Sequence, residues 1–414
     1  MQKIKKVVKA VFLISMIFSA VAFSAVYIMG QSISENYKIT RGDTLKIDSY
    51  IPVTAEYNGA KMSQMNTHNV GDVFEVDLKI FGLIPFSTAQ VEVVDEMYVS
   101  VLGNPFGMKI YTDGVLVIEL SDVDTVSGNV NPAKKAGIEV GDYIISVNGH
   151  KITCNEDLSD IVSKSNGEIM NFKVLHNGKT CNCKVSPQKS VETGTYRIGI
   201  WVRDSSAGIG TLTFYSPASG VICGLGHGIC DSDTGGLLTL ESGELVGAQI
   251  VSVAKGSDGN PGELKGKFTF DSIANIALNA ENGVYGLYKG KNDVSNLTEI
   301  ALKQEVTDGE AQILCTVDGD TPKLYSCTVK KRNSTYFSAT QNLTVTVTDK
   351  ELIEKTGGIV QGMSGSPVLQ NGRLIGAITH VLVDDPTTGY AIFAENMLET
   401  AQSVANENKL KDAS

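Results

Sequence analysis

The chain lacks the features that would bring it to nucleic acid or to a metal. Its formal net charge is −11, and no extended run of lysine and arginine lies outside the N-terminus. Because phosphate backbones bind concentrated Lys and Arg, this composition argues against a nucleic-acid partner. Neither Cys-x-x-Cys nor His-Glu-x-x-His occurs, and only His227 lies near Cys223 and Cys230. That is too few ligands for a zinc site, so we expect neither a metal nor another cofactor.

Long segments with apolar residues at helical spacing are also scarce, and the short strand-like runs found instead are typical of a mainly β protein. The chain has 42 glycines and many short runs rich in Val, Ile and Thr, which predict strands joined by turns. One amphipathic helix is expected near the end, over Glu395 to Lys409. A length of 414 residues predicts two or three domains. The seven cysteines are an odd number, and their pattern leaves open whether all are free or one pair forms a disulfide.

The N-terminal residues 1–30 predict a signal-anchor or transmembrane segment. Val11 to Met29 is almost continuously apolar, which is about the length that crosses a bilayer as a helix. Four lysines precede this run, so the positive-inside rule places the rest of the chain outside the cytoplasm. A cleavable signal peptide is the alternative, because Ala20-Val21-Ala22 and Phe23-Ser24-Ala25 within this run both resemble small-residue cleavage sites.

Residues 31–95 are expected to form a β-rich extracytoplasmic linker module, and residues 96–190 resemble a PDZ domain. In the first region, 73–80 and 91–94 alternate as strands do. In the second, Asn131–Gly149 gives a short helix, a strand and an Asn-Gly turn, a pattern that resembles the PDZ hallmark. The resemblance implies an α+β domain whose carboxylate-binding loop holds Phe106, Gly107 and Met108. We expect an extended peptide to bind there, the alternative being a PDZ-like fold kept only for packing.

Residues 191–414 are predicted to be a serine peptidase domain. The run Gly362-Met363-Ser364-Gly365-Ser366-Pro367 places a serine between two glycines on a tight turn, and Asn371-Gly372 then predicts a hairpin. A turn without chemistry is the simpler alternative. For catalysis, Ser364 is the expected nucleophile and Ser366 its rival, with backbone N–H groups of Gly362 and Ser364 as the oxyanion hole.

A serine nucleophile needs a base and an acid that orients this base. Of the histidines in this region, His227 lies between two glycines on a separate loop, whereas His380 follows the serine hairpin directly. His227 is therefore the expected base. Asp349 is the expected acid, with Asp231 and Asp233 as alternatives close to His227. The order His, Asp, Ser is that of chymotrypsin-like enzymes, although Asp349 lies only 15 residues before Ser364 (364 − 349).

Taken together, these regions resemble the SpoIVB peptidase family (stage IV sporulation protein B) of endospore-forming bacteria. The similarity is densest at residues 207–215, 226–227, 259–263 and 356–367. It implies a chymotrypsin-like double β-barrel with a C-terminal helix, and the catalytic residues His227, Asp349 and Ser364. It also implies self-cleavage and cleavage of a membrane-bound regulator of an intramembrane metalloprotease, which releases a mother-cell sigma factor from its precursor. The family acts between the forespore and mother-cell membranes, and its PDZ domain controls target recognition.

Two rival functions are considered. One is a catalytically inactive, membrane-tethered PDZ scaffold, which would lack a member of the triad. The other is a quality-control protease of the HtrA type, in which the protease precedes the PDZ domain, the reverse of the order predicted here.

Overall fold

The structure is a computed structural model that describes residues 12–17, 19, 24, 33, 35–47, 49, 52–62, 69–291, 294–332 and 339–412. The predicted transmembrane segment, residues 1–30, lies mostly outside this part of the chain. Within the described residues, no helix is both long and apolar enough to cross a bilayer.

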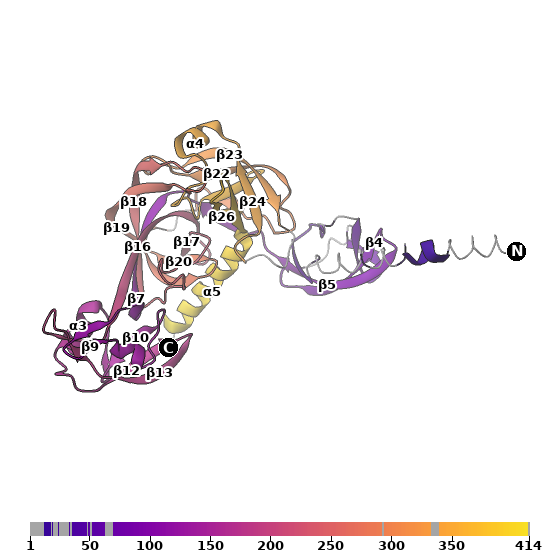
Figure 1. Cartoon of the computed structure of the whole chain (residues 1–414). Coiled ribbons are helices and arrows are strands. Elements are labelled where there is room, and N and C mark those ends of the chain that lie inside the picture. Colours follow the sequence, from indigo (N-terminus) through magenta and orange to yellow (C-terminus); the bar gives the residue numbers. More distant parts are fainter. Residues whose placement is uncertain are drawn as a thin grey trace.

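A small β-module comes first, as expected for residues 31–95. Its five strands pair in the order β1-β5-β4-β2-β3, and Figure 1 shows it beside the main body, next to the N-terminus. The strands are β1 (Asn36–Thr40), β2 (Val53–Tyr57), β3 (Ala60–Lys61), β4 (Val73–Ile80) and β5 (Ile84–Val94). Side chains along β4 alternate between exposed and buried, because successive residues of a strand point to opposite faces. The two strands predicted here are confirmed.

The first of two barrels follows. Strands β7, β18, β19, β20, β17 and β16 pair in that order, and β16 pairs back with β7, which closes the ring. These strands are β7 (Pro105–Leu120), β16 (Ile200–Ser216), β17 (Val221–Gly224), β18 (Ser242–Ala254), β19 (Glu263–Ala280) and β20 (Gly283–Tyr288). Two shorter strands, β6 (Tyr98–Val101) and β21 (Thr298–Glu299), continue the sheet beyond β16.

A PDZ-like domain is inserted between the first two strands of this barrel. Strands β7 and β16 run on past the barrel, and β7 pairs there with β10. Figure 1 shows the inserted domain at the far end of these two strands. Its elements are β8 (Val123–Thr125), β9 (Gly128–Val130), α2 (Pro132–Lys135), β10 (Tyr143–Val147), β11 (His150–Lys151), α3 (Asn155–Ser163), β12 (Met170–His176), β13 (Lys179–Val185), β14 (Gln188–Lys189) and β15 (Tyr196–Arg197).

The insertion corrects two predictions. The boundaries 96–190 and 191–414 cut through both domains, because β6 and the first half of β7 belong to the barrel and Tyr196–Val202 belongs to the PDZ-like domain. The predicted carboxylate-binding loop is also wrong. Phe106, Gly107 and Met108 lie inside β7, where both edges of the strand are already paired, with β16 and with β18. Phe106 is completely buried in the barrel core, and Met108 lines a cleft shared by the two barrels rather than the groove of the PDZ-like domain. The three residues therefore do not form a peptide-binding loop of the PDZ-like domain.

The second barrel closes with the strand order β22-β23-β24-β27-β26-β25. Its strands are β22 (Gly309–Cys315), β23 (Lys323–Lys331), β24 (Leu343–Val347), β25 (Pro367–Gln370), β26 (Arg373–Leu382) and β27 (Asp385–Phe393). Helix α4 (Lys350–Thr356) precedes the serine loop, and α5 (Ala394–Asp412) ends the chain. The predicted C-terminal helix is confirmed, and Met397, Leu398 and Ala401 bury its apolar face. All seven cysteines are free.

Candidate active site

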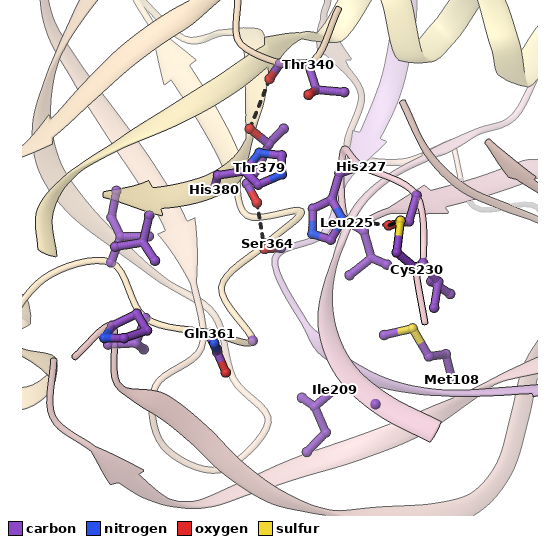
Figure 2. Close-up of a pocket in the computed structure, with 18 of the residues that line it drawn as sticks. Met108, Ile209, Leu225, His227, Cys230, Thr340, Gln361, Ser364, Thr379 and His380 are labelled. Carbon is purple, nitrogen blue, oxygen red and sulfur yellow. Dashed lines mark hydrogen bonds between the residues drawn. The ribbon is translucent and has the colours of Figure 1, made fainter. Parts of the chain in front are cut away.

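A cleft of about 980 Å³ is lined by residues of both barrels. His227 reaches it from the first barrel, and Ser364 and His380 reach it from the second. Figure 2 shows the side chains of these three residues gathered on one side of the cleft. The structure therefore brings the predicted nucleophile and the predicted base to one place.

Strand β16 of the first barrel holds the serine loop. The N–H of Thr211 donates to the carbonyl of Ser364 (2.9 Å), and the Thr211 hydroxyl donates to the carbonyl of Gly362 (2.8 Å). Two residues further along β16, the Thr213 hydroxyl donates to the carbonyl of Gly365 (2.7 Å). Gly365 has a φ of +96°, and a Cβ there would lie 1.9 Å from the Thr211 oxygen. Only glycine fits this position, which explains the glycine after the serine.

The two serines of the loop have different surroundings. Ser364 is half-buried and lines the cleft, and its hydroxyl donates to the carbonyl of Thr379 (2.9 Å). Ser366 is fully buried, and its hydroxyl has no hydrogen-bond partner. A nucleophile must reach its substrate, so accessibility favours Ser364.

Two N–H groups of this loop remain unused. Among the described residues, the backbone N–H groups of Gly362 and Ser364 donate to no protein acceptor, whereas those of Met363, Gly365 and Ser366 are all bonded within the fold. Free N–H groups beside a nucleophile are what an oxyanion hole requires. They are the two groups that the sequence analysis expects to form the oxyanion hole, and this role stays a prediction.

His227 sits on a strained turn directly after β17. Leu225 and Gly226 both have a φ of +67°, a conformation that is costly for leucine and is found mostly where function demands it. The Nδ1 of His227 lies 2.8 Å from the carbonyl of Gly228. Because a carbonyl can only accept, Nδ1 carries the proton and Nε2 is free to act as a base. Burial lowers the pKa of His227, although the Gly228 carbonyl opposes this effect.

His380 is the neighbour of the predicted base. The ring centroids of His380 and His227 lie 5.0 Å apart, with the planes inclined at 35°. Desolvation, together with the charge of His227, lowers the pKa of His380 to about 4. His380 is therefore neutral near pH 7, and it forms an aromatic wall beside the base.

Asp349, the predicted acid, is not brought to His227, and this is a correction. One carboxylate oxygen of Asp349 accepts the N–H groups of Glu351 and Leu352 at the start of α4, and the other accepts the N–H of Ser326. Asp349 is thus the N-cap of a helix. The cap was visible in the sequence, because Asp349 precedes the apolar pair Leu352-Ile353 and Gly357 ends the helix.

The two alternative acids do not contact His227 either. Asp231 and Asp233 both form ion pairs with Arg203 of β16. The side chain of Asp231 is completely buried and shapes the loop that follows His227.

Glu281 is the residue that the sequence analysis missed. It is the single Asp or Glu among the residues that line the cleft. It lies in the turn between β19 and β20, where its carbonyl accepts the N–H of Gly228 (3.0 Å). Its side chain is exposed. No local motif marks this residue, because its nearness to His227 results from the pairing of strands that are distant in the sequence.

Comparisons with known proteins agree with this architecture. The model of the SpoIVB peptidase S55 family matches residues 194–398, and that of the PDZ domain matches residues 100–186. The "Probable periplasmic serine endoprotease DegP-like" of Pseudomonas putida is 34% identical over 91 residues, 18% of this chain and 19% of that protein. The "Probable protease eep" of Enterococcus faecalis is 33% identical over 90 residues, 21% of each. The chain thus spans about a fifth of the length of these relatives.

Two solved structures are similar to parts of the chain. The PDZ domain of an SdrC-like protein from Listeria monocytogenes is 22% identical and covers 22% of this chain and 87% of that one, with a TM-score of 0.18. The thermostable serine protease AL20 from an extremophilic microorganism is 11% identical and covers 49% of this chain and 92% of that one, with a TM-score of 0.29.

Two β-barrels that bring a serine and a histidine to one cleft, joined to a PDZ domain and matched over residues 194–398 by a serine-peptidase family, give the chain the architecture of a serine peptidase. The chain belongs to the SpoIVB peptidase family, through its residues 194–398 and its PDZ domain.

Proposed function

We propose that this protein is a signalling endopeptidase of sporulation, which cleaves itself and then a membrane-bound regulator of an intramembrane metalloprotease. The single observation that supports catalysis most strongly is the meeting of Ser364 and His227 in one cleft, from two barrels. The regulator, the release of the mother-cell sigma factor and the location between the two membranes come from the family. Residues 1–30 would tether the protein to the membrane.

The cleft also suggests which peptides it takes. Beside the serine loop it is lined by the apolar side chains of Ile359, Val360, Val381 and Val383. An apolar recess favours an aliphatic side chain next to the bond that is cut, because a charged side chain would lose its hydration there.

The PDZ domain would supply a second contact with the target. A groove of about 530 Å³ runs between α3 and the strand Ile200–Val202, with Leu158 and Val162 on its helical wall. In the described chain, the N–H groups of Ile198 and Gly199 at one end of this groove donate to no protein acceptor. Apolar walls with free N–H groups at one end suit an extended peptide with a terminal carboxylate. This groove takes the place of the predicted Phe106 loop.

The direct test compares the full-length wild type with Ser364→Ala and Ser366→Ala. Self-cleavage and labelling by a fluorophosphonate are the readouts, and Ser366→Ala is the matched control, since Ser366 is buried in the same loop. We expect the wild type and Ser366→Ala to be labelled and cut, and Ser364→Ala to be neither. If Ser364→Ala folds and is still labelled, Ser364 is not the nucleophile.

An inactive PDZ scaffold is the second candidate, because the Ser364 hydroxyl bonds to Thr379 rather than to His227. This function predicts that the folded wild type is neither labelled nor cut. The sporulation role is tested separately, in an endospore-forming host whose own copy is deleted. A Ser364→Ala copy should leave the mother-cell sigma precursor unprocessed, whereas a wild-type copy should restore its processing.

A further inference from the structure

Arg203 lies at the junction of the PDZ domain and the first barrel. It follows Val202 on β16, and residues 200–202 of the same strand form a wall of the PDZ groove. Further along the strand, residues 207–209 line the catalytic cleft, and Thr211 and Thr213 hold the serine loop. A single strand therefore connects the groove to both catalytic loops.

The side chain of Arg203 binds the loop that follows His227. Its guanidinium forms ion pairs with Asp231 and with Asp233, the latter at 2.6 Å, and donates to the Ser232 hydroxyl at 3.2 Å. These contacts attach residues 231–233 to β16. In the part of the chain that the structure describes, no carboxylate forms a hydrogen bond or ion pair with His227, so the position of its imidazole depends on how its own loop is held.

Asp231 is the residue through which this attachment shapes the loop. One of its oxygens accepts the N–H groups of Asp233 (3.0 Å) and Thr234 (2.9 Å). The backbone of Asp231 also closes the loop, since its N–H donates to Gly236 and its carbonyl accepts from Gly235, both at 2.8 Å. The Asp231 carboxylate is fully buried, and a buried carboxylate that loses its guanidinium partner is strongly destabilising. The conformation of the loop therefore depends on Arg203.

We propose that Arg203 is a positioning residue for the catalytic base, and that it couples the occupancy of the PDZ groove to catalysis. A peptide that adds to the edge of Ile200–Val202 fixes the register and twist of β16 at that point. Because Arg203 lies on the same strand and pairs with Asp231 and Asp233, a fixed β16 also fixes the loop that follows His227. The inference rests on the proposed peptidase function, and it adds a route by which a bound peptide controls that site.

The test compares Arg203→Ala, Arg203→Lys and Asp231→Asn in the full-length protein. Asp231→Asn keeps the oxygen that caps the loop and removes only the charge that Arg203 binds. The matched control is Arg373→Ala, because Arg373 is equally exposed (30% against 31%) and also pairs with two acidic residues, Glu299 and Glu305, away from the cleft. The readouts are the rate of fluorophosphonate labelling, the pH at which this rate is half-maximal, and the melting temperature.

We expect Arg203→Ala to slow labelling by about ten- to a hundredfold and to raise the half-maximal pH, because a looser loop exposes His227 to water. Arg203→Lys should recover part of the rate, and Arg373→Ala should lower only the melting temperature. If Arg203→Ala does not fold, Asp231→Asn carries the same expectation. The inference is overturned if the Arg203 and Asp231 variants label as the Arg373 control does. If the wild type itself is not labelled, the peptidase function has failed instead.

The coupling to the groove has its own measurement. Ser159→Trp on α3 places a large side chain in the groove and serves as the probe, since it needs no known ligand. We expect it to change the labelling rate at least threefold in the wild type and to have little effect in the Arg203→Ala background. If the two substitutions multiply independently, the groove is not coupled to the base through Arg203.

Discussion

The imidazole rings of His227 and His380 lie 5.0 Å apart on the same side of the cleft, one from each barrel. Two imidazoles at this distance do not both take a proton easily, and burial disfavours the charged form of each. His380 packs beside the base, and burial favours the neutral form of His227, which is the form that removes a proton from serine.

The first prediction concerns the pH dependence of the wild type. Because burial lowers the pKa of His227 from its ordinary value of 6.5, the base stays mostly neutral as the pH falls through 6.5. The rate of fluorophosphonate labelling should therefore be half-maximal below pH 6.5, and a stopped-time labelling series from pH 4 to 8 would measure it. A midpoint above pH 6.5 would contradict the burial of His227.

A second prediction separates the ring of His380 from its ability to ionise. His380→Ala admits water to His227, so the pKa of His227 should rise and the half-maximal pH of labelling should move upward. His380→Phe keeps an aromatic wall and is the matched control, for which we expect a midpoint close to that of the wild type. Equal shifts in both variants would mean that the imidazole itself, rather than the packing, sets the pKa of the base.

A third prediction addresses Asp349. Because Asp349 is a helix N-cap, Asp349→Ala should lower the free energy of unfolding by about 1 kcal/mol. It should leave the labelling rate nearly unchanged. Asp349→Asn can still cap the helix, so its stability should stay near that of the wild type. The assignment fails if Asp349→Asn keeps its melting temperature but loses labelling, since Asp349 would then act in catalysis.

The fourth prediction concerns Glu281, the acidic residue at the rim of the cleft. Because the side chain of Glu281 is exposed, a water-like dielectric applies, in which a carboxylate near a forming imidazolium stabilises its positive charge by at most about 1 kcal/mol, or roughly fivefold in rate. Glu281→Gln should slow labelling by about this factor at low salt and less at high salt. The measurement compares labelling rates at two ionic strengths. A rate that does not change would place Glu281 outside the catalytic step.

The fifth prediction compares two glycines of the same region. Gly365 and Gly372 have positive φ angles of +96° and +77°, but a Cβ would meet the Thr211 oxygen at 1.9 Å in the first and nothing within 4 Å in the second. Each alanine substitution pays about 1–2 kcal/mol for its backbone conformation, and only Gly365→Ala adds a clash. We expect Gly365→Ala to abolish labelling and Gly372→Ala to keep it, as measured beside thermal unfolding.

The sequence identified those parts of the site that depend on local chemistry. The glycines beside Ser364 and His227 mark turns, and turns are determined by the residues within them. The segment around Phe106 was misassigned because its local pattern fits a loop as well as a strand, and only the distant partners β16 and β18 decide between them. Glu281 was missed for the same reason, since it reaches the cleft through pairings made along the whole barrel.

The insertion of the PDZ domain between β7 and β16 also has a consequence for how the chain folds. The first barrel closes by pairing Pro105 with Thr211 and Tyr111 with Ser205, residues about a hundred positions apart in the chain. Closing so long a loop is entropically costly and slow when the intervening chain is unfolded. A PDZ domain that folds first brings the two strands together and shortens the search. Simple truncation could not remove this domain without opening the barrel, and a functional deletion would need a short hairpin in its place.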